Sequence, residues 1–160
     1  MVSRQFQAVL VQVGTFRLGI PLHQVVEALQ MVALETLPDA PAHCLGSFNF
    51  HGAQLVVLDL AARLGVPRAE KEAHTRGMLV LQVTGGRIGL AVDRVLYIGR
   101  AELPPPEYLP TLPATQELLE GFVSIKGTLV PVINSEALVR DELRAAARTL
   151  LEASAGPVGP

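Results

Sequence analysis

The fold is indicated most directly by residues 46–60, which read GSFNFHGAQLVVLDL. Phe48 and Phe50 alternate with polar neighbours, and Gly52 interrupts the run before a nearly continuous apolar stretch begins at Leu55. Alternation with a period of two is typical of a strand, and a short glycine-containing break between two such runs is typical of a tight turn. The stretch therefore predicts a β-hairpin.

The same hairpin pattern occurs twice in the chain. Residues 121–135, GFVSIKGTLVPVINS, repeat the glycines and apolar positions of residues 46–60 at an offset of 121 − 46 = 75. The string RLGI at 17–20 returns as RIGL at 87–90, at an offset of 88 − 18 = 70. We therefore expect two halves built to one plan. The additional 75 − 70 = 5 residues of the second half are placed in the proline-rich residues 103–114.

The rest of the two halves also has the pattern of strands. Residues 6–13 predict a strand buried on both faces, with residues 16–22 as its hairpin partner. Residues 25–37 fit a helix or a strand, but their repeat at 94–103 is β-branched and aromatic. Both are therefore interpreted as strands, and the first of them follows a helical turn at 21–24. Short strands separated by glycine turns are typical of small barrels.

The periodicity changes after the second hairpin. Apolar residues recur there every three or four positions, which predicts an amphipathic helix over residues 136–152 with Ser135 as its cap. Residues 153–160 are expected to be a disordered tail. The predicted fold is thus mainly β, with two pseudo-symmetric five-stranded barrels at about 6–65 and 77–135 and a carboxy-terminal helix. The charged residues 65–77, GVPRAEKEAHTRG, are interpreted as a solvated linker between the barrels.

Composition limits the possible functions. With 160 residues, of which 49% are apolar and 18% charged, the chain can bury a substantial core without metal or disulfide. A net charge of −2 and an aromatic content of 4% disfavour nucleic acid as a partner. The first residues show neither a signal peptide nor a membrane span, and the single Cys44 is compatible with a reducing compartment. We therefore expect a cytoplasmic protein without direct membrane insertion.

The titratable residues do not form a recognisable catalytic pattern. The four histidines lack the spacing of metal ligands, and Ser47 and Ser124 do not lie in a nucleophile motif. Asp59 and Asp93 are candidate carboxylates, but Asp59 ends a predicted strand, where it can cap a short helix. Its repeat mate Asn134 can cap a helix equally well but cannot perform acid–base chemistry. The sequence predicts no catalytic residues, no metal and no cofactor, so the protein is not expected to be an enzyme.

Residues 37–65, LPDAPAHCLGSFNFHGAQLVVLDLAARLG, resemble the signature of CheW-like domains, the adaptors that couple chemoreceptors to the CheA histidine kinase. The similarity extends over roughly residues 6–140, because the motif at 18–27 and the second-half EGFVSIKGTLVPVIN at 120–134 fall in the expected order. The resemblance implies a single CheW-like domain over residues 1–152. It also implies two Src-homology-3-like barrels around a shared apolar seam, and a role in signal transduction through binding.

The resemblance further implies two kinds of partner. In the family, a groove between the barrels takes the cytoplasmic tip of the receptor, and barrel ends pair with the regulatory domain of the kinase. At the matching positions, the receptor-binding groove is expected to involve Val25, Glu27, Asn49 and His51. Val95 and Ile98 are apolar positions beside the expected seam and are the candidates for facing the kinase. Association with membrane receptor arrays would then occur through these partners.

One position departs from the family pattern. His51 stands where the family has arginine, so a permanent charge with five donors is replaced by a group that is mostly neutral near pH 7. This leaves open a divergent adaptor that binds only one partner in a pathway other than flagellar motility. A small-ligand-binding protein or an enzyme using the groove between the barrels is a further alternative. A homodimer through exposed strand edges is also possible.

Overall fold

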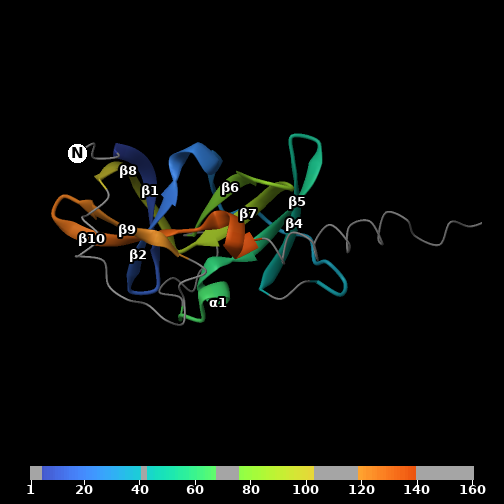
Figure 1. Cartoon of the computed structure of the whole chain (residues 1–160). Coiled ribbons are helices and arrows are strands. Elements are labelled where there is room, and N and C mark those ends of the chain that lie inside the picture. Colours follow the sequence, from blue (N-terminus) through green and yellow to red (C-terminus); the bar gives the residue numbers. More distant parts are fainter. Residues whose placement is uncertain (1–4, 41–42, 68–75, 103–118, 140–160) are drawn as a thin grey trace, which may run out of the picture.

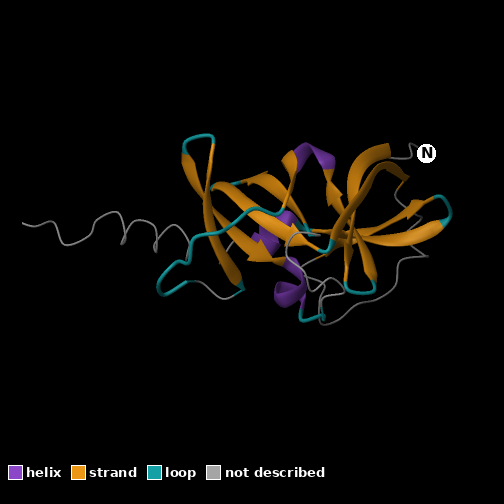
Figure 2. Cartoon of the chain, turned by 180° about the vertical axis from the view of Figure 1, so that it is seen from behind, coloured by secondary structure: helices purple, strands orange, loops and turns teal. Residues whose placement is uncertain are grey.

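The computed structural model describes residues 5–40, 43–67, 76–102 and 119–139, most of which lie in strands (Figure 2). The strands of the first half are β1 (Gln5–Val13), β2 (Phe16–Pro21), β3 (Val25–Gln30), β4 (Cys44–Phe50) and β5 (Ala53–Asp59). Those of the second half are β6 (Gly77–Val83), β7 (Gly86–Val92), β8 (Arg94–Glu102), β9 (Leu119–Ile125) and β10 (Thr128–Ile133). The described helical segments are the 3-10 turn η1 (Leu22–Gln24), helix α1 (Leu60–Leu64) and residues 135–139.

The strands form two sheets of five (Figure 1). The first is a closed barrel in the order β1-β2-β10-β9-β8, called here the first barrel, and the second sheet has the order β3-β6-β7-β5-β4. A mainly β fold with two five-stranded sheets is therefore confirmed. The barrel boundaries predicted at about 6–65 and 77–135 are wrong, because each sheet takes strands from both halves of the chain. Periodicity defined the strands but not their partners.

The strand pairing shows how the two halves of the chain exchange hairpins between the sheets. Hairpin β1–β2 pairs with β8 on one side and, in parallel, with β10 on the other. In the second sheet, hairpin β6–β7 pairs with β3 and, again in parallel, with β5. Each half thus contributes its first hairpin to one sheet and its third strand and second hairpin to the other. The arrangement is pseudo-symmetric, as the internal repeat indicated, but the repeat did not predict the exchange of hairpins between the halves.

A tight chain crossing links the two edge strands of the second sheet. Glu35, which follows β3, exchanges two backbone hydrogen bonds with Ser47 of β4, with N···O distances of 2.8 and 2.9 Å. Gly46 lies at this crossing with a φ of 143°, and a Cβ there would lie 2.5 Å from the Glu35 carbonyl oxygen. Only glycine fits such a close approach. The strand predicted over 25–37 ends at Gln30, where its pairing with β6 stops. The following residues cross to β4, with which Glu35 forms its bridge.

Apolar side chains fill three regions. The interior of the first barrel holds a small cluster with Leu10 and Val132. The interior of the second sheet is lined by residues such as Met78 and Val80. The largest cluster, the interface core, lies between the sheets and consists of Val9, Val11, Val13, Leu18, Ile20, Leu58, Leu60, Ala61, Leu79, Leu81, Val83, Ile88, Leu90, Val92, Ile133, Leu138 and Val139. Successive residues of β1 enter different clusters, which confirms the prediction that this strand is buried on both faces.

Each half ends its second hairpin with a capped helical turn. The Ala61 N–H donates to Asp59 Oδ1 over 3.2 Å at the start of α1, which confirms Asp59 as a cap. In the second half the Ala137 N–H donates to Asn134 Oδ1 over 3.2 Å. Asn134 is therefore the cap, and the prediction of Ser135 is wrong, because Ser135 is already helical and buried.

The helix that begins at residue 135 also connects the two sheets. The Glu136 carboxylate accepts hydrogen bonds from the Thr84 N–H, over 2.9 and 3.1 Å, and from its hydroxyl over 3.3 Å. Thr84 lies in the turn between β6 and β7. The rest of the predicted helix 136–152, the tail 153–160 and the insertion at 103–114 lie outside the described residues, as does most of the linker.

Candidate functional site

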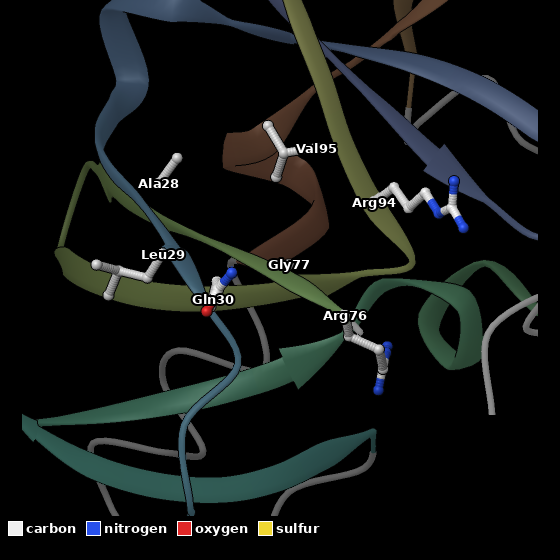
Figure 3. Close-up of a pocket in the computed structure, with 7 residues that line it drawn as sticks. All are labelled: Ala28, Leu29, Gln30, Arg76, Gly77, Arg94 and Val95. Atoms are coloured by element: carbon white, nitrogen blue, oxygen red, sulfur yellow. The ribbon is translucent and has the colours of Figure 1, made fainter. Parts of the chain in front are cut away.

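A groove opens between the two sheets, where β3 and the start of β6 face the start of β8 (Figure 3). Its volume is about 520 Å³. The described residues that line it are Ala28, Leu29, Gln30, Arg76, Gly77, Arg94 and Val95. A groove with this lining offers an apolar surface with a few polar positions, which suits a docked polypeptide segment.

The floor of the groove is fixed by a close contact between the sheets. A Cβ at Gly77 would lie 2.9 Å from the Val95 Cγ2, so the start of β6 approaches β8 too closely for a side chain at residue 77. Val95 is half-buried and packs against the interface core. The groove is therefore formed by rigid strands anchored in a core of buried side chains.

The structure brings Glu27 and His51, two of the predicted receptor-binding residues, together. The Glu27 Oε2 lies 3.7 Å from the His51 Nε2, and the side chains are 45% and 77% exposed. Glu27 directly precedes Ala28 of the groove lining on β3, but neither Glu27 nor His51 is itself a lining residue. An exposed pair of this kind contributes little to stability and is available to a partner.

The turn between β4 and β5 positions His51. The residue adopts a left-handed conformation with a φ of 49°, followed by Gly52 with a φ of 90°. The Gly52 N–H donates to Asn49 Oδ1 over 2.9 Å, so the predicted Asn49 shapes the turn. The Phe50 ring meets the His51 ring edge to face, with centroids 4.4 Å apart. The imidazole is therefore in contact with its own hairpin through Phe50 as well as with Glu27 of β3.

The other predicted residues differ in burial and position. Val25 is half-buried and packs against the interface core, and a β-bulge separates its pairing from that of Glu27. Ile98 is 57% exposed on β8, while Val95 of the same strand lines the groove. Of the two residues assigned to the kinase, Ile98 is thus exposed and Val95 is half-buried.

Sequence reasoning missed Arg76, which forms a buried ion pair. Its Nη2 lies 3.1 Å from Asp59 Oδ1, and the two side chains are 3% and 5% exposed. Arg76 had been assigned to a solvated linker, so that assignment is wrong at this residue. Asp59 therefore both caps α1 and holds the start of β6. The signal was faint, because a basic residue just before a strand has many uses and no spacing rule pairs it with Asp59.

Asp93 and Cys44 are two further titratable residues whose surroundings indicate a structural role. Asp93 is buried and accepts a hydrogen bond from the Gly14 N–H over 2.6 Å, which fixes the β1–β2 turn. Burial raises the pKa of the Cys44 thiol, and a backbone hydrogen bond of Gly46 offsets part of this effect. A raised pKa lowers the thiolate fraction and hence the reactivity. In the described ranges, histidine, cysteine and acidic side chains do not gather into groups of three or more that could bind a metal.

Comparison with known proteins places this architecture in a family. The CheW-like domain model matches residues 7–143, so the chain belongs to the CheW-like family. It is 35% identical over 106 residues to the probable chemotaxis protein CheW of Rhizobium etli, covering 64% of this chain and 66% of that protein. It is 31% identical over 115 residues to the chemotaxis protein CheW of Rhizobium meliloti, covering 69% and 72%. Protein FrzA of Myxococcus xanthus is 37% identical over 100 residues, covering 59% and 61%.

A solved structure shows the same fold. The scaffolding protein TtCheW of Thermoanaerobacter tengcongensis superposes with a TM-score of 0.69 at 19% identity, covering 84% of this chain and 88% of that one. The matched region spans just under two thirds of the Rhizobium etli protein and of FrzA. None of the helices in the described parts of the chain is long and apolar enough to cross a membrane.

Proposed function

We propose that this chain is a coupling adaptor that joins the cytoplasmic tip of a chemoreceptor to the regulatory domain of a CheA-type histidine kinase. The observation that carries the proposal is the groove between the two sheets, with an apolar floor at Ala28, Leu29 and Val95. An amphipathic helix inserts its apolar face into a groove of this kind. The adaptor would act by binding alone, without a catalytic step or a cofactor.

Family membership supports this reading. The matched relatives include proteins named for chemotaxis, and the matched structure is named as a scaffolding protein. A scaffold needs surfaces whose relative positions are fixed, and the interface core supplies this by packing strands from both sheets. We place the protein in the cytoplasm, at receptor arrays that it reaches through its partners.

The proposed receptor site combines the groove with the neighbouring turn. Glu27 and His51 provide polar contacts beside the groove, and Asn49 maintains the turn that presents His51. Val25 supports the same strand from the interface core. Val95 lines the groove, so we assign it to the site that binds the receptor helix. The exposed Ile98 is therefore the better candidate for binding the kinase. A homodimer through the edge of β3 or β4 stays a prediction that sedimentation analysis can check.

The test is a calorimetric titration of the full chain against two fragments from the same genome. One is the soluble helical tip of a receptor, and the other is the kinase regulatory domain. The proposal expects a Kd of about 1 μM or tighter for both, which is about −8 kcal/mol. An Ile98→Asp substitution should weaken kinase binding and leave receptor binding unchanged. Absence of binding to both fragments would overturn the adaptor function.

A second candidate is favoured by His51, which takes the place of the family arginine. Under this alternative the chain binds the kinase but not the receptor. A His51→Arg variant supplies the permanent charge, and His43→Arg is a matched control because His43 is also exposed and left-handed, with a φ of 65°. Receptor affinity that appears only in His51→Arg would support the one-partner adaptor. Equal receptor affinity of wild type and His51→Arg would exclude it.

A further inference from the structure

Strand pairing makes residues 70 positions apart equivalent across the two sheets. Val11 of β1 pairs with Val95 of β8, and Leu81 of β6 pairs with Val25 of β3. The offsets are 81 − 11 = 70 and 95 − 25 = 70, and a bulge lies next to this pair in both sheets. A pseudo-twofold axis therefore exchanges β1 and β8 with β6 and β3. Each residue of these strands that lines the groove has a counterpart at an equivalent position of the other sheet.

The counterparts of three groove residues have larger side chains. The replacements are Ile98 for Ala28, Arg100 for Gln30 and Gln7 for Gly77. Gln7 and Arg100 are paired neighbours on β1 and β8, and Ile98 lies two residues from Arg100 on the same face of β8. All three are exposed, and the exposed fraction of Ile98 is 57%. These three residues, called here the ridge, therefore project where the equivalent positions leave a groove.

The groove and the ridge also differ in the charge that they offer to a partner. The two arginines of the groove lining, Arg76 and Arg94, point away from the groove in Figure 3, and Arg76 is neutralised by Asp59. The edge strand β3 carries the carboxylate of Glu27, whose side chain is 45% exposed. The ridge carries the exposed guanidinium of Arg100, which can bind a carboxylate through its planar fork. Opposite charges on a hollow surface and a projecting surface favour contact between the two.

We infer that the ridge of one copy of this chain binds in the groove of a second copy. Ile98 of the first copy contacts Ala28 and Val95 of the second, and Arg100 of the first binds Glu27 of the second. Burial of an exposed apolar side chain in an apolar groove supplies the free energy of this contact, and the charges set its orientation. The contact is heterologous, because the groove and the ridge are different surfaces. After one contact, the first copy keeps a free groove and the second keeps a free ridge.

This self-association goes beyond the proposed function and does not depend on it. A chain whose groove holds another copy cannot hold a receptor helix in the same groove. Because association of copies increases with protein concentration, it would reduce the fraction of grooves that are open to other partners.

Sedimentation velocity of the full chain over a range of protein concentrations tests this contact. The sedimentation coefficient of wild type should rise with concentration. Ile98→Asp and Ala28→Arg should each lower the association constant by about tenfold or more, because each brings an unpaired charge into an apolar contact. The matched control is Leu129→Asp, since Leu129 is also exposed, to 42%, but lies on β10 outside the ridge. Its association constant should equal that of wild type.

A mixture of the two impaired variants tests whether the contact is heterologous. Ile98→Asp keeps an intact groove and Ala28→Arg keeps an intact ridge, so the mixture should form a one-to-one complex although each variant alone associates weakly. A symmetric pairing of strand edges would not give this result. Glu27→Arg and Arg100→Glu should each weaken association, and the double variant should regain affinity because the exchanged charges are again opposite.

A wild type that stays monomeric at every concentration would overturn the inference. Association that Ile98→Asp leaves unchanged would also overturn it and would assign the contact to another surface. A mixture of Ile98→Asp and Ala28→Arg that forms no complex would do the same. These results do not involve the receptor and kinase fragments, so they leave the proposed function to its own test. Thermal unfolding equal to that of wild type confirms that each variant is folded.

Discussion

The hairpins β4–β5 and β9–β10 have turns of the same conformation, but the side chains at these turns make different contacts. His51-Gly52 connects β4 and β5 with φ angles of 49° and 90°, and Lys126-Gly127 connects β9 and β10 with φ angles of 50° and 78°. The positions are repeat mates, because 126 − 51 = 75. In each turn a basic side chain therefore projects from an equivalent backbone.

The partners of these two side chains are also repeat mates. His51 meets Glu27 of β3, and the Lys126 ammonium lies 5.1 Å from the ring centroid of Tyr97 of β8. Glu27 and Tyr97 differ by 97 − 27 = 70, the offset of the earlier part of the repeat. One contact joins an exposed carboxylate and an imidazole, and the other is a cation–π contact. The duplicated frame thus places equivalent side chains together, and residue identity alone decides the chemistry presented at each end.

The largest expected effect is the difference in stability loss between substitutions of the two helix caps that follow these hairpins. Asp59→Ala removes a cap and leaves the Arg76 charge buried without its carboxylate, which costs about 3–5 kcal/mol. The repeat mate Asn134→Ala removes only a cap, at about 1 kcal/mol. Urea unfolding of both variants measures the difference. Equal losses would show that the buried ion pair adds nothing to the cap.

The next effect concerns the chain crossing that belongs to the first of the two hairpins. Gly46→Ala should destabilise the protein by about 3 kcal/mol, because its Cβ would clash with the Glu35 carbonyl in a conformation that side chains avoid. Gly52→Ala is the control, since it shares a positive φ but has open space around it, and should cost about 1–2 kcal/mol. Thermal unfolding distinguishes the two. A Gly46→Ala loss no larger than that of Gly52→Ala would contradict the close approach.

Residues with a local signal were predicted well from the sequence. Alternation and glycine turns located the strands, and the repeat identified the equivalence of the two hairpins. The repeat could not tell which hairpin joins which sheet, because a strand with both faces apolar fits either one. The cap at Asn134 was confused with Ser135 because both residue types cap helices and boundaries are uncertain by one residue.

The candidate site was predictable only in part. Glu27 and His51 were named together through the family pattern, and they meet in the structure. Arg76 and Arg94 were missed because each stands at the start of a strand, and the groove that they line forms only when both sheets are assembled. Contacts between residues distant in sequence leave no periodicity, so local patterns do not reveal them.

A smaller effect on stability tests the cation–π contact between Lys126 and Tyr97. Lys126→Met should destabilise the protein by about 0.5–1 kcal/mol, because Tyr97 is only 38% exposed and loses a cation over its ring. Lys126→Arg should retain most of the stability. A double-mutant cycle with Tyr97→Leu measures the coupling between the two residues. A coupling energy of zero would mean that the contact has no energetic weight.

The smallest effect concerns the contact between Glu27 and His51. Arginine carries a permanent charge, so His51→Arg should stabilise the protein by about 0.2–0.5 kcal/mol at low salt by pairing with the Glu27 carboxylate. The same substitution in a Glu27→Gln background should have no such effect, and 1 M NaCl should abolish it through screening. Denaturant unfolding at both salt concentrations measures these differences. A gain that persists in Glu27→Gln would assign the effect to the turn rather than to the pair. If His51→Arg increases the free energy of receptor binding by more than it increases the free energy of unfolding, residue 51 acts mainly on the partner. The two equivalent turns then have different roles: the Lys126 turn stabilises its barrel, and the His51 turn presents a binding residue.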